Sequence, residues 1–252
     1  MSLLKTKHIG WQVLFLIGLL LLSPSAYSQS PSAFCDNFED GDSWQSRWGV
    51  SQGYQTLVSS PAHSGTGALE FHGGCESSIY RKNFSASAGY YTAWVNQRHY
   101  EAGFAMFILF QPGGSSEPWA KEGYALYLSA QDTQIPSFVF ERQYDGGVGY
   151  VLGTGVPSFL KDEWIQVFIR RLPGNTFVAG YERNGVRDSI VCSDPNAPID
   201  PAGEYCLWAC SDVPPYTYFD DVCYQALPPV PQAFCDHFDD GLADWTPFHS
   251  TP

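Results

Sequence analysis

Residues 33–41 read AFCDNFEDG and residues 233–241 read AFCDHFDDG, so seven of nine positions are identical without a gap. A period of 200 residues has the size of a whole domain, because solenoid units are only ~20–50 residues long. Residues 226–232 (ALPPVPQ) hold three prolines and are typical of a semi-rigid extended linker. We therefore predict a complete domain over residues 34–225 and the start of a truncated second copy, a tandem repeat, over residues 233–252.

The first 28 residues have the layout of a secretory signal peptide. Lys5 and Lys7 precede an uncharged apolar run from Ile9 to Leu22, and Ala26-Tyr27-Ser28 fits a small-x-small cleavage site. The run is shorter than the ~20 apolar residues that span a bilayer, although an uncleaved N-terminal anchor is the alternative. We predict that residues 1–28 are removed, and that the mature protein is secreted or at the cell surface without membrane insertion.

The composition is acidic and rich in aromatic residues. The chain has 26 Asp and Glu against 13 Lys and Arg, a formal net charge of −13. Nucleic acid is disfavoured as a partner, because binding it requires Lys and Arg to neutralise phosphates. The acidic balance favours divalent cations or neutral ligands instead. Aromatic residues at 16%, with 24 Gly and 18 Pro, are typical of a β-rich exported domain with many turns.

Short alternating segments run through the domain. In Trp164–Arg170 (WIQVFIR), Ile165, Val167 and Ile169 share one face, as expected of a half-buried strand. Asn184-Gly185 predicts a tight hairpin turn. No stretch of ten or more residues in the mature chain combines helical periodicity with caps. We predict an all-β fold, a two-sheet antiparallel jelly-roll sandwich. The other expected strands are 90–97, 104–111, 124–130, 176–182 and 219–224.

Several short motifs resemble the concanavalin A-like (laminin G-like) superfamily, of the kind common in secreted bacterial proteins. Galactose-binding-type jelly rolls share similar openings and closings, but their modules are usually shorter than this domain. The resemblance implies a jelly-roll sandwich in which the first and last strands are neighbours. The motifs are Phe38-Glu39-Asp40-Gly41 with Trp44 and Trp48, His63–Leu69, Gly123–Leu126, Glu163–Val167, Tyr181–Gly185 and Tyr218–Val222.

A structural calcium ion is implied by this resemblance. Glu39, Asp40 and Asp221 are hard oxygen donors on the first and last strands, so their carboxylates could converge. Ca²⁺ takes about 6–8 oxygens, and the turn at Ser64 and Gly65 could supply carbonyl oxygens. The alternative is that these acids only cap turns. We predict a Ca²⁺ site at these five positions.

The seven cysteines of an exported chain predict disulfides. Cys235 belongs to the second copy, which leaves six cysteines and 15 possible pairings in the first. The adjacency of the first and last strands predicts Cys35–Cys223. Cys192 is expected to pair with Cys206 or Cys210, which follow it in a loop-rich segment. A metal–thiolate site is disfavoured because no CxxC pair is present.

Glycan recognition needs exposed aromatic rings on which sugars stack, with polar side chains beside them. Trp119 lies in a loop rich in Gly, Ser and Pro and is the strongest candidate. Other residues could line the concave sheet, although Trp44, Trp94, Trp164 and Trp208 can also be explained by core or rim packing. The candidate ligand-binding residues are Trp119, Trp94, Tyr100, Tyr127, Arg142 and Tyr144.

No catalytic motif was identified. Glycosidases of this fold need an ExDxxE strand that holds two carboxyl groups ~5–5.5 Å apart, and no such run is present. Glu101 with His99 or Tyr100 could be an acid–base group, but a solvated strand end explains them equally. We predict a non-catalytic carbohydrate-recognition module. The alternatives are a glycan-acting hydrolase or lyase of the same fold and a structural or adhesive spacer, because the fold does not choose among them.

Overall fold

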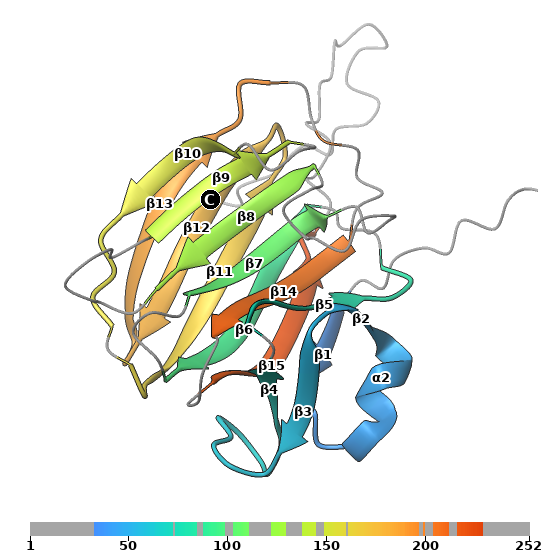
Figure 1. Ribbon diagram of the computed structural model, residues 1–252. Helices are drawn as coiled ribbons and strands as arrows, with labels where there is room; N and C mark the ends of the chain where they lie inside the picture. The colour runs from blue at the N-terminus through green and yellow to red at the C-terminus, as the bar shows by residue number, and fades with distance from the viewer. Residues whose placement is uncertain are drawn as a thin grey trace, which may run out of the picture.

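The computed structural model describes residues 33–72, 74–84, 88–98, 103–110, 122–129, 138–144, 149–159, 161–196, 199, 204–211 and 216–228. Two antiparallel sheets are stacked as layers, and the two short helices of this part of the chain, η1 (Gly41–Ser43) and α2 (Trp44–Arg47), lie at one side (Figure 1). The predicted all-β sandwich is therefore confirmed. None of the helices in the described ranges has the length and apolarity that crossing a membrane would require. The predicted signal peptide and second copy lie outside the described residues.

The first sheet has eight strands and the second has seven. The eight-stranded sheet runs in the order β13-β12-β11-β6-β15-β4-β3, and β1 also pairs with β15. The seven-stranded sheet runs in the order β10-β9-β8-β7-β14-β5-β2. The strands of the eight-stranded sheet are β1 (Ala33–Asp36), β3 (Tyr54–Val58), β4 (Ala68–His72), β6 (Gly89–Gln97), β11 (Trp164–Leu172), β12 (Thr176–Arg183), β13 (Val186–Ser193) and β15 (Thr217–Ala226). Those of the seven-stranded sheet are β2 (Trp48–Gln52), β5 (Gly74–Arg81), β7 (Gly103–Phe110), β8 (Gly123–Leu128), β9 (Phe138–Gln143), β10 (Gly149–Gly155) and β14 (Glu204–Ser211).

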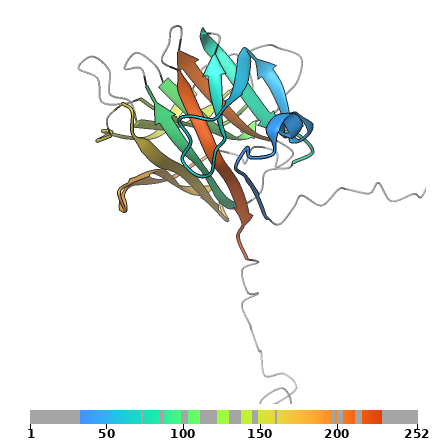
Figure 2. The same ribbon diagram turned by 90° about the horizontal axis from the view of Figure 1, so that it is seen from below.

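The two ends of the domain meet in one seam. β1 pairs with β15 in antiparallel register, with Phe34 opposite Tyr224 and Cys35 opposite Cys223. Figure 2 shows β1 in dark blue beside the orange-red β15. A disulfide joins Cys35 to Cys223 across 188 positions of sequence, which confirms the predicted bridge. Closing a loop of that length restricts the unfolded chain strongly and so stabilises the fold.

The core lies between the sheets and follows strand alternation. Ile165, Val167 and Ile169 of β11 are all buried in it, as their shared face predicted. The turn between β12 and β13 places Asn184 and Gly185 at φ of 50° and 76°, which fits the type I′ hairpin that this dipeptide favours. Aromatic rings dominate the interior, and the largest buried side chains include Trp44, Trp48, Tyr91, Tyr124, Tyr181 and Tyr205. Each sheet then has an outer face, and these two faces hold the candidate sites.

Candidate functional site

The outer face of the seven-stranded sheet carries a second, smaller apolar cluster. On β14, Tyr205, Leu207 and Ala209 point into the core, so the alternate residues Cys206 and Trp208 point outward. The cluster combines three small residues with larger rings packed against them, and Trp208 is 9% exposed. We call this surface the aromatic face and define it by the floor residues Ala105, Ala125 and Cys206 and the aromatic residues Tyr80, Tyr127 and Trp208.

Strand register brings the members of the aromatic face together from distant segments. Ala105 of β7 is paired with Trp208 on one side and with Tyr127 of β8 on the other. Cys206 is paired with Tyr80 of β5. The rings of Tyr127 and Trp208 meet edge to face with centroids 6.2 Å apart, an arrangement that aromatic pairs prefer. The result is a floor of small side chains flanked by aromatic rings.

Polar groups lie on the same outer face. Gln143 of β9 is buried, and its Nε2 donates to the Tyr127 hydroxyl and to Glu141 Oε1, the latter at 3.1 Å. Three buried acceptor atoms on this face have no hydrogen-bond partner in the described part of the chain: Ser78 Oγ, Gln143 Oε1 and Glu204 Oε2. Buried polar atoms are nearly always paired in native proteins, so these three require an explanation.

Burial also changes the titration of this face. Desolvation raises the pKa of Glu204 to about 7, and it raises the pKa of Glu141 as well. The pKa of the Tyr127 phenol is raised, first by burial and then by the nearby Glu141 carboxylate. A carboxyl group that exchanges its proton near neutral pH can donate or accept a hydrogen bond there. Groups of this kind cluster at binding and catalytic sites.

The two acids are too far apart to form a glycosidase pair. Glu204 is on β14 and Glu141 is on β9, and β7 and β8 lie between these strands in the sheet. Three strand spacings of about 4.8 Å separate their backbones by roughly 14 Å. Glycosidase carboxyl groups lie about 5–5.5 Å apart in retaining enzymes and about 6.5–9.5 Å apart in inverting ones. The arrangement therefore fits ligand contact better than two-carboxylate hydrolysis.

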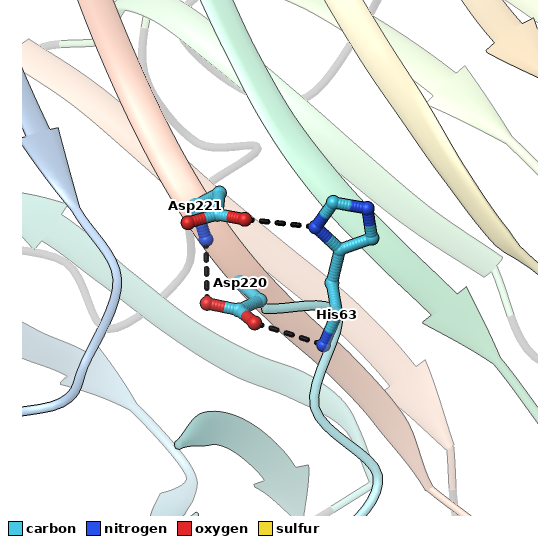
Figure 3. Close-up of side chains that lie close together, drawn as sticks. All are labelled: His63, Asp220 and Asp221. Carbon is cyan, nitrogen blue, oxygen red and sulfur yellow. Dashed lines mark hydrogen bonds and ion pairs between the residues drawn. The ribbon is translucent and has the colours of Figure 1, made fainter. Parts of the chain in front are cut away.

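The predicted metal ligands lie around one loop, residues 63–67, which we call the His63 loop. A bulge in β15 between Asp220 and Cys223, with Asp221 at φ of 45°, lets two consecutive acids face this loop. Asp220 accepts a hydrogen bond from the His63 amide at 2.9 Å (Figure 3). It also accepts one from the Ser64 amide at 3.0 Å. Its other oxygen accepts the Asp221 amide at 2.7 Å. Burial raises the pKa of Asp220.

The Asp221 side chain completes the contact between β15 and the loop. Asp221 Oδ2 lies 2.8 Å from His63 Nδ1 (Figure 3). Asp221 Oδ1 accepts a hydrogen bond from the Ser64 hydroxyl at 3.0 Å. One ligand atom from each of His63, Asp220 and Asp221 falls within 4.8 Å of the others. Asp220 Oδ2 and both oxygens of Asp221 are hydrogen-bonded to groups of the loop, which is the arrangement of carboxylates that hold a turn.

The five predicted metal positions do not form one ligand set. Glu39 accepts the Thr66 hydroxyl at 2.8 Å and the Thr66 and Gly67 amides at 2.7 Å each. The Thr66 hydroxyl, followed by these amides, lowers the pKa of Glu39. Asp40 turns away to Arg47, whose guanidinium lowers the Asp40 pKa. Because N–H and O–H donors occupy the carboxylates, turn capping accounts for these acids better than convergence on a calcium ion.

The predicted ligand-binding residues are divided among separate places. Trp94 is on the outer face of the eight-stranded sheet, where the His63 imidazole stacks on its ring at 3.6 Å. Arg142 is buried at the inner side of β9, and it donates to Asp194 at 2.6 Å and to Glu122 at 2.5 Å. The Tyr144 ring lies 5.2 Å from the Arg142 guanidinium. The four of these residues that the structure describes do not share one surface, because among Trp94, Tyr127, Arg142 and Tyr144 only Tyr127 belongs to the aromatic face.

Trp119 and Tyr100, the other two predicted ligand-binding residues, lie outside the described residues. Prediction also missed Trp208, Glu141, Gln143 and Glu204. Trp208 was assigned to packing, and no motif marked the three polar residues. Their common signal is position on one face of neighbouring strands, which depends on the strand register.

The predicted bridge from Cys192 to Cys206 or Cys210 was also wrong. Cys192 and Cys206 are free thiols, and Cys210 is disulfide-bonded to another partner. Cys192 is on β13 and packs against the main core, whereas Cys206 is on β14 with its side chain on the aromatic face. The seven-stranded sheet therefore separates the two thiols. Burial raises the pKa of both.

The same fold occurs in solved lectin-like domains. The Emp46p carbohydrate recognition domain, in a potassium-bound form, aligns with a TM-score of 0.54 and 10% identity over 78% of this chain and 98% of that one. The VIP36 exoplasmic/lumenal domain, bound to Ca²⁺ and Man3GlcNAc, aligns with a TM-score of 0.52 and 10% identity over 83% and 91%. Winged bean acidic lectin, complexed with methyl-α-D-galactose, aligns with a TM-score of 0.52 and 11% identity over 76% and 96%. No family model and no curated protein sequence matches the chain.

These likenesses define the fold of this chain, a two-sheet jelly-roll sandwich of the concanavalin A-like kind. Identities of 10–11% show the fold alone and do not show which ligand this chain binds. The laminin G-like subtype and the secreted bacterial origin stay predictions.

Proposed function

We propose that this protein is a carbohydrate-recognition module that binds a glycan on the aromatic face. The observation that carries the proposal is a set of three buried acceptors that have no partner in the part of the chain that the structure describes, on a face that also contains aromatic rings. They are Ser78 Oγ, Gln143 Oε1 and Glu204 Oε2. Sugar hydroxyls donate hydrogen bonds to such acceptors, while the C–H faces of the sugar ring pack on aromatic side chains. The structural neighbours support the proposal, since the Emp46p domain is a carbohydrate recognition domain and the VIP36 and winged bean lectin structures contain bound saccharides.

A glycan array tests this proposal. We expect the wild-type protein to bind a subset of neutral glycans, and we expect Trp208→Ala to weaken that binding tenfold or more. Stacking and buried hydrogen bonds are each worth about 1–3 kcal/mol, which corresponds to roughly 5–150-fold in affinity. Trp164→Ala is the matched control, because Trp164 lies near His63 at the outer face of the other sheet. Equal loss in both variants, or no binding by the wild type, would contradict the proposal.

A glycan-acting enzyme is the second candidate, and the pKa of about 7 at Glu204 is the observation that favours it. A single carboxyl with that pKa suits general acid–base chemistry near neutral pH. The test is release of reducing sugar or of unsaturated products from a polysaccharide panel. Product formation that Glu204→Gln abolishes would replace the binding proposal with an enzymatic one. Silence in both assays would favour a structural spacer.

Two further predictions concern the whole protein. Export by the signal peptide would place the domain outside the cell, where polysaccharides occur, and tandem copies would raise avidity through effective concentration. A calcium requirement is not part of the proposal, because the predicted ligands are hydrogen-bonded to the His63 loop and to Arg47.

A further inference from the structure

A separate cavity of about 320 Å³ lies on the eight-stranded sheet, on the opposite side of the sandwich from the aromatic face. Its volume is at the lower end of the range for small-ligand pockets, about 300–1,000 Å³. We call it the arginine pocket. It is lined by Tyr90, Arg170, Arg187, Gln225, Ala226, Leu227 and Pro228.

Arg187 is held in a fixed position over the sheet. Its guanidinium lies 4.5 Å from the centre of the Phe168 ring, so the side chain reaches across β12 from β13 to β11. Its Nη2 donates to Glu182 at 3.0 Å and to the Tyr90 hydroxyl at 3.2 Å. Nε and Nη1 form no hydrogen bond with a described residue. A guanidinium with fixed orientation and free donors is preorganised for a planar anion.

Arg170 provides a second positive charge at the same place. It lies opposite Tyr90 in the β11–β6 register, and it is exposed. It has no ion pair within the described ranges, in contrast to Arg47, Arg98 and Arg183. The lining contains two arginines and no carboxylate among the described residues, although the whole chain has a net charge of −13. Glu182, which is not part of the lining, is ion-paired with Arg187 at 3.0 Å, so Arg170 supplies the uncompensated positive charge of this pocket.

The remaining wall is apolar and fixed in position. β15 continues into Leu227, whose amide donates to the Ala88 carbonyl at 3.3 Å. Ala226, Leu227 and Pro228 then lie across the pocket from the arginines, with the Gln225 side chain beside them. Tyr90 and this wall offer apolar surface to a ring, while Gln225 offers an amide donor and acceptor. The pocket combines an anion site with a surface for an uncharged ring.

We propose that the arginine pocket binds the negatively charged residue of an acidic saccharide, a pyranose that bears a carboxylate or a sulfate group. The anionic group accepts paired hydrogen bonds from Arg170 and Arg187, and the ring lies on Tyr90, Leu227 and Pro228. This site is distinct from the aromatic face and goes beyond the proposed function. It would give the domain a preference for acidic polysaccharides that its overall charge opposes.

Isothermal titration of the full chain with four oligosaccharide probes tests this proposal: galacturonate, glucuronate and sulfated galactose oligomers, and neutral galactose oligomers. We expect at least one acidic probe to bind and Arg170→Ala to weaken it tenfold or more. Arg170→Lys should retain part of the affinity, because it keeps the charge but loses the planar fork. The matched control is Arg171→Ala, which removes the same charge from the neighbouring position of β11, outside the pocket lining.

The arms of the experiment separate the outcomes. Preference for galacturonate and glucuronate identifies a carboxylate ligand, and preference for sulfated galactose identifies a sulfate ligand. Equal affinity for neutral and acidic probes, equal losses in Arg170→Ala and Arg171→Ala, or binding of no acidic probe would overturn the proposal. Trp208→Ala should leave acidic binding intact, so failure of this proposal and failure of the aromatic-face proposal are distinguishable.

Discussion

The His63 loop and the aromatic face both contain acidic side chains, but the two regions differ in how the buried polar atoms are hydrogen-bonded. In the loop, Asp220 accepts three backbone amides and Asp221 contacts the His63 ring and the Ser64 hydroxyl. On the aromatic face, Glu204 Oε2 and Gln143 Oε1 are buried without a hydrogen-bond partner among the described residues. A cluster of acids is therefore not by itself evidence of a ligand site. The fully paired group is explained by the fold, and the unpaired group requires a further partner.

This difference separates structural from functional effects of mutation. Changes in the loop should lower the free energy of unfolding and leave ligand affinity intact. Changes to the buried polar groups of the aromatic face, such as Glu204→Gln, should lower ligand affinity and leave stability near the wild-type value, or raise it.

Asp220→Ala should have the largest effect on stability. The substitution leaves the His63, Ser64 and Asp221 amides without their acceptor, and an unsatisfied buried donor costs about 1–3 kcal/mol. We expect the free energy of unfolding to fall by about 3 kcal/mol or more in urea titration, with glycan affinity unchanged in the folded variant. Asp162→Asn, which removes the charge from the exposed ion pair with Arg98 and tolerates the φ of 65° at this position, is the control and should cost at most about 1 kcal/mol. Equal costs for the two variants would refute the structural role of Asp220.

Glu204→Gln should have a smaller effect on stability, with the opposite sign. The pKa of Glu204 is about 7 in the folded protein, above the ordinary value, so ionisation opposes folding. This cost is absent below about pH 4.5, grows between pH 4.5 and 7, and is constant above that range. At pH 8 we expect the variant to be more stable than wild type by about 1–3 kcal/mol, allowing for partial exposure.

Thermal melts between pH 4 and 8 measure this difference. The two proteins should converge at pH 4, and glycan affinity should fall in Glu204→Gln. Asp42→Asn, which removes an exposed acid from η1, should follow the wild-type profile. A constant offset between Glu204→Gln and wild type across the pH range would argue against burial of the carboxylate.

The sequence predicted the fold because the fold depends on local and regular signals. Alternation in Trp164–Arg170 identified a strand, and Asn184-Gly185 identified the hairpin that follows the next strand. The domain start at the repeat of residues 33–41 stays a prediction. Pairing of the first and last strands then followed from the jelly-roll resemblance. Cys35–Cys223 is confirmed because both cysteines lie on these two strands in direct register.

The site could not be predicted in the same way, because it depends on register and on irregular backbone. The segment Glu204–Ser211 (EYCLWACS) has apolar residues on both faces, so alternation does not show which way Trp208 points. Only the long-range pairing of β14 with β7 and β5 places it beside Tyr127. Likewise, consecutive acids in a regular strand would face opposite sides, and the bulge at Asp221 is what turns both to one loop.

Removal of divalent cations should have the smallest effect on stability. It tests the comparison between the His63 loop and the aromatic face directly. Calcium requires about 6–8 converging oxygens, whereas Glu39, Asp220 and Asp221 already accept hydrogen bonds from the loop. We therefore expect the melting temperature to be the same in EDTA and in millimolar Ca²⁺, measured on one preparation. Asp220→Ala should lower the melting temperature in both buffers, because it removes the hydrogen bonds that Asp220 accepts from the His63 and Ser64 amides. A lower melting temperature in EDTA for wild type, lost in Asp221→Asn, would show that the loop is a metal site and that hydrogen-bond satisfaction does not distinguish the two regions.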